Sequence, residues 1–328
     1  MYNKLPKVEL HIHLDCSLSY DVVALLIPGI SLEDYRNKFT APKNCCSLND
    51  YIECAQAAIN YMQTKEQLRI VTLDLLAQFD ADNVVYAEMR FAPLQHLQLG
   101  LTPEEVVQEV LNAIVEGKKQ YKVEANVILC TLRNFSEAQS METAELALNF
   151  KNSGVVGFDI AADEVGYPLD NHVSAFKFAK SNNIFCTAHA GEALGPISVW
   201  ETLEKLAPNR IGHGIRSIED ASLIERLIEN NIHLEVCPTS NQLTRVYPSL
   251  EEYPINKLYN TGVSMSISTD GRAISSVDLN REYQFMTNQY GWTIIDLYRI
   301  NTEAIKHSFA TEEVKMAVQA KLDAFYLV

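Results

Sequence analysis

The sequence predicts an α/β fold, a (β/α)8 barrel of the TIM type, on three observations. Eight short apolar runs alternate with longer amphipathic stretches along the 328 residues. Most of the runs are nearly continuous in aliphatic residues, as expected for parallel strands that are buried on both faces. Polar residues that can do chemistry stand at the carboxyl ends of these runs, and those ends meet on one face of a closed parallel barrel. A doubly wound sheet also alternates strands and helices, but it does not predict this gathering.

The apolar runs are the expected strands, and helix signals lie between them. In chain order the runs are Val8–Leu14, Val84–Pro93, Ala125–Arg133, Val155–Asp163, Ile184–Glu192, Arg210–Ile215, Ile232–Asn241 and Val263–Asp270. At Thr102, an N-cap residue, a first-turn proline and two acids precede apolar residues at helical spacing. The stretch Ser217–Asp220 opens another helix in the same way.

Two stretches exceed what a minimal barrel needs. Residues 47–80 are long enough for two helices, so we expect an insertion between the first and second strands. After Asp270 the sequence predicts mostly helix, ending with a helix over residues 311–328. Because no repeat, linker or low-complexity segment interrupts the chain, we expect residues 1–328 to form a single barrel domain.

The charge and cysteine content exclude several partners. The chain has 27 Lys+Arg against 42 Asp+Glu, a formal charge of −15, which repels phosphate backbones and anionic lipids. We therefore expect a small-molecule partner and neither a nucleic-acid polymer nor a membrane, although an acidic surface is also a common solubility feature. The seven cysteines include no CxxC pair, and no secretion signal opens the chain, so we expect a cytoplasmic location. The oligomeric state cannot be inferred from the sequence.

Four residues at strand ends form a candidate metal site. His11 and His13 are two positions apart on a strand, so both project to the same face. Such a pair alone is also typical of hydrogen-bonded core histidines. His189 and Asp270, at the ends of other strands, change the interpretation, because three imidazoles and a carboxylate suit zinc and leave a position for water. The sequence therefore predicts one Zn²⁺ per chain.

Two further residues suit a hydrolytic reaction at such a metal. Bound Zn²⁺ lowers the pKa of water from about 16 towards about 7. Attack on an aromatic amidine carbon then needs an acid for the adjacent ring nitrogen and a group that manages the water proton. Glu192 is placed to be the acid if a dry pocket raises its pKa, and His213 lies on the next strand between two glycines. Taken singly, these residues would be a surface glutamate and a core histidine.

The remaining histidines carry no such pattern. His96, His172 and His307 are interpreted as packing or surface residues. The stretch His233–Pro238 contains elements of cytidine-type deaminase motifs, but their order is wrong and the second cysteine is missing.

Six ordered motifs resemble the adenosine deaminase family of the amidohydrolase barrels, essentially from end to end. They are Pro6–Asp15, Val156–Glu164, His189–Glu192, Arg210–Gly214, Cys237–Asn241 and Ser268–Asp270. The resemblance implies hydrolytic deamination of a purine nucleoside, with zinc held by His11, His13, His189 and Asp270. It also implies that Glu192 protonates N1 of the purine, and that His213 orients and deprotonates the attacking water.

The resemblance also suggests how the substrate is bound. Asp15 matches the position associated with the ribose 5′-hydroxyl, where adenine deaminases usually have Glu, which favours adenosine and 2′-deoxyadenosine. The backbone N–H of Ala162 would face N3. The same chemistry on adenine, an N6-substituted adenine or aminodeoxyfutalosine is the alternative. AMP is less favoured, because no basic cluster accompanies the motifs to hold a phosphate.

Three departures from the family pattern stand near the site. Cys16 and Ala162 each replace a usual glycine, and Gly271-Arg272 replaces the Asp-Pro that follows the metal-ligand aspartate in many members. That missing acid is associated with purine N7, a hydrogen-bond acceptor. Because arginine is a permanent donor, one hypothesis is that Arg272, directly or through water, serves N7. The alternative is that Arg272 pairs with a nearby acid such as Glu282.

Two other classes of protein use this fold. A catalytically silent relative would lack a ligand, the acid or the base, and this chain has all six residues. A binuclear barrel hydrolase acting on esters usually has a bridging lysine on the fourth strand, where this chain has Asp159 and Asp163. One metal ion per chain would distinguish the predicted enzyme from the binuclear class.

Overall fold

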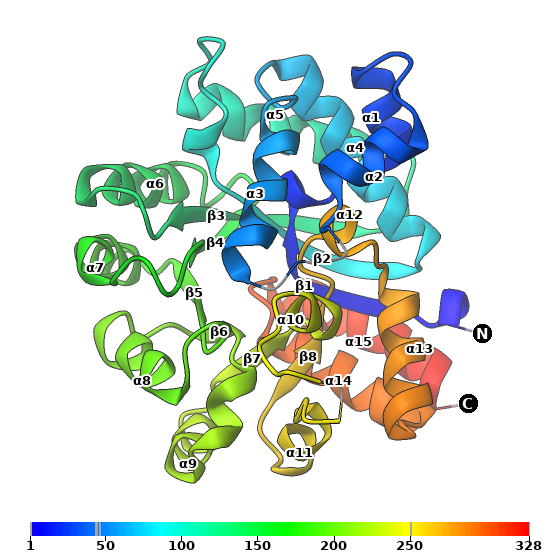
Figure 1. Ribbon diagram of the computed structural model, residues 1–328, viewed down its shortest axis with the longest axis vertical. Helices are drawn as coiled ribbons and strands as arrows, with labels where there is room; N and C mark the ends of the chain where they lie inside the picture. The colour runs from blue at the N-terminus through cyan, green and yellow to red at the C-terminus, as the bar shows by residue number, and fades with distance from the viewer. Residues whose placement is uncertain (1, 43–44, 46, 250, 328) are drawn as a thin grey trace.

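The protein, for which a computed structural model describes residues 2–42, 45, 47–249 and 251–327, is built around a parallel barrel (Figure 1). Within these residues, eight strands pair in chain order and every neighbouring pair is parallel. They are β1 Lys7–His13, β2 Val84–Phe91, β3 Glu124–Leu132, β4 Val155–Ala161, β5 Phe185–Ala190, β6 Arg210–His213, β7 His233–Val236 and β8 Met265–Ile267. The backbone of Asp270 bonds to both His11 and His13, which closes the ring and confirms the predicted (β/α)8 barrel.

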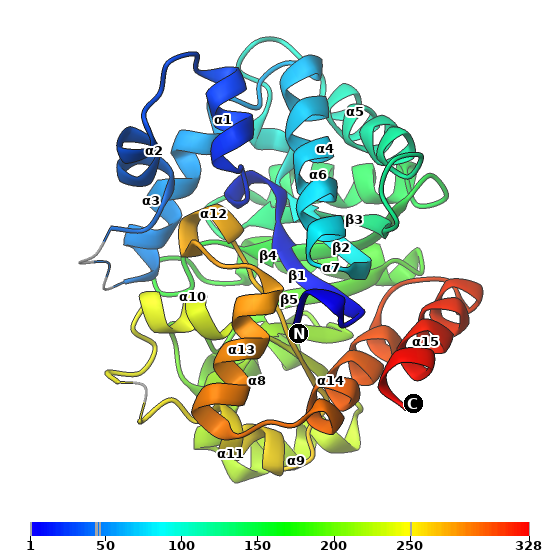
Figure 2. The ribbon, with the colours of Figure 1, turned by 90° about the vertical axis from the view of Figure 1, so that its right-hand side faces the viewer.

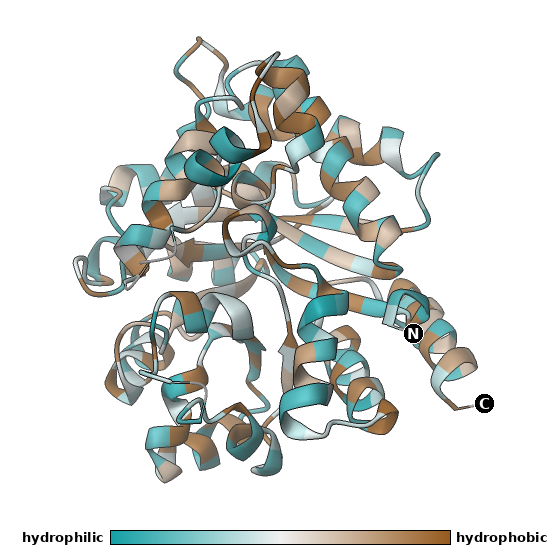
Figure 3. Cartoon of the chain, turned by 45° about the vertical axis from the view of Figure 1, so that its right-hand side comes forward, coloured by the Kyte–Doolittle hydropathy of each residue, from teal (hydrophilic) through white to brown (hydrophobic). Residues whose placement is uncertain are grey.

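Amphipathic helices cover the outside of the barrel. Those that follow β2 to β6 are α5 Pro103–Gly117, α6 Glu137–Asn149, α7 Val173–Ser181, α8 Pro196–Lys205 and α9 Ala221–Glu229. Figure 3 shows hydrophilic and hydrophobic residues mixed along the helices around the barrel, as expected for helices with one apolar stripe and one polar face. Helix α5 begins with the predicted cap, since Thr102 Oγ1 accepts the Glu105 N–H and the Glu105 carboxylate accepts the Thr102 N–H. The cap of α9 is Asp220 rather than Ser217, because residues Ile215–Glu219 form a 3-10 turn first.

Both predicted insertions are present. Between β1 and β2 lie α1 Tyr20–Leu26, α2 Leu32–Phe39, α3 Leu48–Ile59 and α4 Lys65–Ala81. After β7 and β8 come α10 Pro238–Leu243, α11 Ile255–Asn260, α12 Arg272–Ser275, α13 Leu279–Tyr290, α14 Ile294–His307 and α15 Glu312–Tyr326. Figure 2 shows α1, α2 and α3 on one side of the barrel and α15 on the other. The Tyr326 hydroxyl donates to the Pro6 carbonyl at 3.1 Å, which ties the end of α15 to the start of β1.

The strands that carry the candidate site end earlier than their apolar runs predict. The run Ile232–Asn241 was expected to be one strand, but β7 ends at Val236 and α10 begins at Pro238. Proline has no N–H to continue a strand ladder, and its fixed φ suits the first turn of a helix. The apolar residues after the strand therefore belong to the loops that carry the site.

The interior of the barrel beneath the candidate site is charged, which the aliphatic strand pattern did not predict. Arg90 lies 2.7 Å from Asp159 and 2.6 Å from Glu235, and Arg210 lies 2.7 Å from Glu235 and 2.6 Å from Glu88. All five side chains are buried. Buried charges are tolerated only when paired in this way, so the network holds the strands in one arrangement.

Two of the histidines interpreted as packing or surface residues, His96 and His172, are buried outside the candidate site, and the third, His307, is half-buried. His96 bonds to the Met62 carbonyl, and His172 bonds to Ser140 and the Arg133 carbonyl. Cys130 and Cys186 are buried, whereas Cys46 lies outside the described residues. Among the helices that are described, none is long and apolar enough to cross a membrane.

Candidate active site

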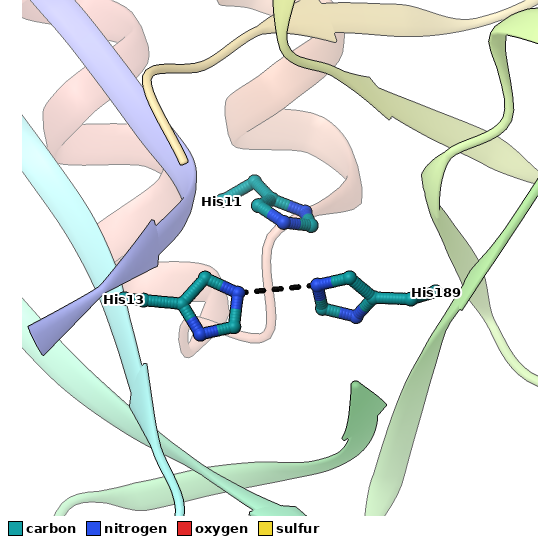
Figure 4. Close-up of side chains that lie close together, drawn as sticks. All are labelled: His11, His13 and His189. Atoms are coloured by element: carbon teal, nitrogen blue, oxygen red, sulfur yellow. Dashed lines mark hydrogen bonds between the residues drawn. The ribbon is translucent and has the colours of Figure 1, made fainter. Parts of the chain in front are cut away.

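The four predicted metal ligands converge at the carboxyl end of the barrel. Figure 4 shows the rings of His11 and His13, from β1, and of His189, from β5, pointing toward one another. The Nε2 atoms of His13 and His189 are 3.1 Å apart. Asp270, three residues after β8, places Oδ1 at 3.7 Å from His11 Nε2 and 3.5 Å from His13 Nε2. The structure therefore brings together residues that are up to 259 positions apart (270 minus 11).

Carboxylates of the charged network orient two of these rings. Glu235 lies 2.7 Å from His11 Nδ1, and Asp159 lies 3.2 Å from His189 Nδ1. Because a carboxylate accepts a hydrogen bond from Nδ1–H, it keeps the proton of the neutral ring on Nδ1 and leaves the Nε2 lone pair free to face the cluster. Arg90 bridges the same two carboxylates and so fixes both at once.

The donor set fits a divalent metal such as zinc. Buried His11 Nε2 has no hydrogen-bond partner among the described residues. Burial, with neighbouring positive groups, holds the pKa values of His11 and His13 well below their ordinary value, so both rings are neutral and can coordinate. Nε2 of His13 and Nε2 of His189 are at hydrogen-bonding distance, and both atoms can serve as metal ligands once neither carries a proton. Three imidazoles and one carboxylate are donors that suit zinc.

Glu192 is buried beside His213, and its raised pKa suits a general acid. Its side chain is buried in the loop after β5, and its Oε2 lies 3.5 Å from His213 Nε2. Its Oε1 has no partner among the described residues. Burial, together with the charges of Asp270 and Glu164, holds the pKa of Glu192 well above its ordinary value of 4.5. A carboxyl group that stays protonated near neutral pH can donate a proton to a ligand.

The loop that carries Glu192 is held by Glu164, a role that sequence reasoning missed. The buried Glu164 carboxylate accepts N–H groups from Gly191, Glu192, Ala193 and Leu194 at 2.6 to 3.2 Å, and the Ser198 hydroxyl at 2.5 Å. Glu164 ends the second family motif, four residues beyond Ile160 on β4. Its position in that motif was the only sequence signal.

His213 lies on the other side of Glu192, with its second nitrogen bonded to Asn241. Asn241 Nδ2 is 3.1 Å from His213 Nδ1, and the Tyr253 hydroxyl donates to Asn241 Oδ1 at 3.2 Å. Because the amide Nδ2 can only donate, Nδ1 of His213 is the acceptor. The proton of the neutral ring, whose pKa burial holds well below 6.5, is therefore on Nε2, which faces the site.

Three predicted site residues have left-handed backbone conformations. Ala162, His213 and Asp270 have φ values of 78°, 60° and 64°. Such conformations are unusual for residues with a Cβ and cluster at functional sites. The value at Ala162 explains why glycine is usual there, because glycine adopts positive φ without strain.

The metal cluster, Glu192 and His213 open into one cavity between the barrel and α3. Residues lining it from the barrel side are His13, Asp15, Cys16, Ala92, Gln95, Leu132, Asn134, Ala161, Ala162, His189, Glu192, His213 and Asp270. Those from α3 are Leu48, Tyr51, Ile52, Ala55, Gln56 and Ile59. Asp15 is buried in this wall, and burial raises its pKa to about 6. The predicted substrate-binding residues Asp15 and Ala162 therefore share the cavity with the catalytic candidates.

Arg272 does not reach this cavity, contrary to the hypothesis that it serves purine N7. Its guanidinium lies 2.9 Å from Asp82 and 3.3 Å from Glu9, and it packs on the Phe79 ring. The alternative, that Arg272 pairs with an acid, is confirmed, but its partners are Asp82 and Glu9 and not Glu282. Arg272 begins α12, and its side chain is directed toward the interface with α4. The partners come from distant segments, which local sequence does not indicate.

Cys16 and Gly271, two of the departures from the family pattern, lie against each other. A Cβ atom added at Gly271 would come within 2.8 Å of Cys16 Cβ and 2.7 Å of the Tyr51 hydroxyl oxygen. Contacts below 3.0 Å are not tolerated, so a side chain at position 271 requires the smaller residue at position 16. With Cys16 and Tyr51 in these positions, only glycine fits at position 271.

The known proteins that resemble this chain are deaminases. The adenosine deaminase family model matches residues 6–325. An adenosine deaminase of Clostridium acetobutylicum is 36% identical over 326 residues, which cover 97% of each chain. The crystal structure of an adenine deaminase from Arthrobacter aurescens superposes with a TM-score of 0.90 at 24% identity, covering 99% of this chain and 100% of that chain. An Arabidopsis protein crystallised with IMP superposes with a TM-score of 0.89 at 24% identity, covering 99% of this chain and 98% of that chain.

Proposed function

This chain belongs to the adenosine deaminase family and is a hydrolytic deaminase, and we propose that its substrates are adenosine and 2′-deoxyadenosine. Water replaces the 6-amino group, giving inosine or 2′-deoxyinosine and ammonia. The observation that carries this proposal is the placement of Glu192, a buried carboxyl group whose pKa is raised, in the cavity lined by His13, His189 and Asp270. A purine must accept a proton at N1 as its neighbour C6 is attacked, and Glu192 is the buried acid that can supply it.

Zinc is the metal that the four ligands would hold, and when bound it supplies Lewis-acid activation of the attacking water. One ion per chain is proposed, since ligand atoms of the three histidines lie within 4.8 Å of one another and Asp270 Oδ1 lies within 3.7 Å of His11 Nε2 and His13 Nε2. The fully buried network of Arg90, Asp159 and Glu235 keeps the ligand rings in position before any metal arrives.

The chain's own residues divide the proton chemistry between them. Glu192 donates its proton to N1, which makes C6 more electrophilic, and this proton stays on N1 of the inosine product. One proton of the attacking water goes to the amino group, which leaves as ammonia, and the other restores the Glu192 carboxyl group. His213 presents Nε2–H to the site, because Asn241 occupies Nδ1. We therefore propose that His213 orients the water and stabilises the charge that develops on its oxygen, instead of removing the water proton. This refines the role inferred from the sequence.

The cavity lining favours an uncharged nucleoside over a nucleotide. Among the described residues that line the cavity there is no lysine or arginine, whereas a 5′-phosphate needs such a donor. Asp15 instead offers a carboxylate that can accept the 5′-hydroxyl of a ribose. The Arabidopsis protein crystallised with IMP has the same fold, so the difference between nucleoside and nucleotide lies in the lining rather than in the barrel.

The test is a comparison of substrates with the purified, metal-loaded protein. Deamination of adenosine, 2′-deoxyadenosine, 5′-deoxyadenosine, adenine and AMP is followed by ultraviolet absorbance under identical conditions. We expect the highest kcat/KM for the first two, a loss of about tenfold for 5′-deoxyadenosine, since one hydrogen bond to a charged group is removed, and little turnover of AMP. An Asp15→Asn variant should narrow the difference between adenosine and 5′-deoxyadenosine. Faster turnover of adenine than of adenosine would overturn the nucleoside assignment.

A further inference from the structure

We propose that the hydroxyl group of Tyr51 recognises N7 of the purine, in the place left open by the absent side chain of Gly271. This inference rests on the proposed function, because it assumes an aminopurine in the cavity. It assigns a specificity-determining role to a residue of the inserted helix α3, outside the motifs that identify the family.

The position of the Tyr51 hydroxyl is the first observation. The side chain is 4% exposed and lines the same cavity as Glu192, His213 and Asp270. Its oxygen lies only 2.7 Å from the position that a Cβ atom at residue 271 would occupy. The hydroxyl therefore occupies space that any side chain at this position would enter, immediately after the expected metal ligand Asp270.

The geometry of a purine places N7 on this side of the cavity. N1 and N7 lie on opposite flanks of C6, the carbon that loses its amino group. Glu192 stands after β5, next to His213 of β6, whereas Tyr51 lies against Gly271 and Ser275 after β8. If Glu192 faces N1 and C6 faces His213 and Asp270, then N7 is turned toward the β8 side, where Tyr51 lies.

Tyr51 can supply the donor that N7 requires. N7 is an acceptor, and a neutral phenol donates one proton. Ser275 Oγ lies 2.9 Å from the Tyr51 oxygen and can donate to it. The phenol proton then has a long contact to the Gly271 carbonyl, at 3.5 Å, which a ligand acceptor can replace. The other candidates are weaker, since Cys16 has only a thiol and Arg272 is paired with Asp82 and Glu9. Asp270 also lies within hydrogen-bonding reach of Tyr51 and is the competing acceptor.

A pair of substrates separates recognition of N7 from support of Asp270. In 7-deazaadenosine, a C–H group replaces N7 and nothing else in the outline of the nucleoside changes. We measure kcat/KM for adenosine and for 7-deazaadenosine with the wild-type protein and with Tyr51→Phe, which keeps the ring and removes the hydroxyl. The variant should lose about tenfold on adenosine and less than threefold on 7-deazaadenosine, so that the preference for adenosine shrinks.

Binding provides a readout that does not depend on turnover. Dissociation constants of inosine and 7-deazainosine, measured by calorimetry, should show the same loss of preference in Tyr51→Phe. Tyr61→Phe is the matched control, because the Tyr61 hydroxyl contacts Lys38 at the surface and does not line the cavity. It should leave both ratios at the wild-type value.

The outcomes distinguish the two proposals. Equal losses on both substrates in Tyr51→Phe would show that the hydroxyl only supports Asp270, and would overturn the N7 assignment. If the wild-type protein deaminates adenine but not adenosine, the nucleoside proposal fails. The ratio measured with adenine and 7-deazaadenine then still decides the role of Tyr51.

Discussion

The two walls of the cavity face the same ligand but are built from different parts of the chain. The strand wall consists of His13, His189, Glu192, His213 and Asp270, at or just beyond the ends of four barrel strands, and His11 is buried behind it. The helix wall consists of the α3 residues Leu48, Tyr51, Ile52, Ala55, Gln56 and Ile59. The strand wall is backed by the paired charges of Arg90, Asp159 and Glu235. The helix wall packs through a small cluster with Cys16 and Ile274, apart from the main core.

This difference separates reaction from recognition. The strand wall holds titratable groups in fixed positions, which deamination of any 6-aminopurine requires. The helix wall is mainly apolar, with one buried hydroxyl, and it belongs to an insertion that the barrel does not need. We infer that changes in the strand wall abolish chemistry, whereas changes in the helix wall alter substrate preference.

The largest effect is expected from the strand wall, on removal of a metal ligand. His13→Ala should lower kcat/KM for adenosine by more than about a thousandfold, because three donors hold the ion poorly and the activated water is lost. Metal analysis should find less than one ion per chain after dialysis. Full metal content together with full activity in this variant would refute the site.

A smaller effect is expected from Asp159, a carboxylate that orients one of the candidate metal ligands. Asp159→Asn keeps the shape but removes the charge that faces His189 Nδ1, so metal affinity should fall by about 10- to 100-fold. The measurement is a competition titration with a zinc chelator. Asp163→Asn is the matched control, since Asp163 caps a turn through Val165 and Gly166 and should leave affinity unchanged. An unaltered affinity in Asp159→Asn would mean that the network supports only the fold.

The helix wall should respond differently. Ile52→Ala removes apolar surface that lines the cavity, so KM for adenosine should rise by about three- to tenfold while kcat stays within about twofold. Steady-state kinetics measure both constants. Leu25→Ala, on the exposed face of α1, is the control. A large fall in kcat would contradict the division between the walls.

The smallest effect on selectivity is expected from Arg272, which touches neither wall. Arg272→Met leaves Glu9 and Asp82 without their partner, and should lower the free energy of unfolding by about 3 kcal/mol in urea denaturation. The preference for adenosine over 7-deazaadenosine should remain at the wild-type ratio. A collapse of that ratio in the folded variant would return the N7 role to Arg272.

Much of the fold and of the strand wall could be predicted from the sequence. The alternation of apolar runs with amphipathic stretches indicates parallel strands and covering helices. A strand that is buried on both faces is apolar throughout, whereas a helix that is buried on one face is apolar only along one stripe. The metal ligands and Glu192 stood out as polar residues at the carboxyl ends of apolar runs. Once a closed barrel is accepted, its geometry brings those ends together whatever their separation along the chain.

Only the tertiary structure decided which partners the charged and polar side chains meet. The direction of the Arg272 side chain depends on its ion pairs with Asp82 and Glu9. The tautomer of His213 depends on its hydrogen bond with Asn241. The space beside Gly271 depends on Tyr51, which is 220 positions away in the sequence. Local sequence determines burial and the face of a strand, because these follow from the periodicity of the backbone. It does not determine contacts between segments, because these depend on how the elements pack. The sequence therefore determined the barrel and the end at which the candidate site lies, and the folded chain decided which side chains face a ligand there.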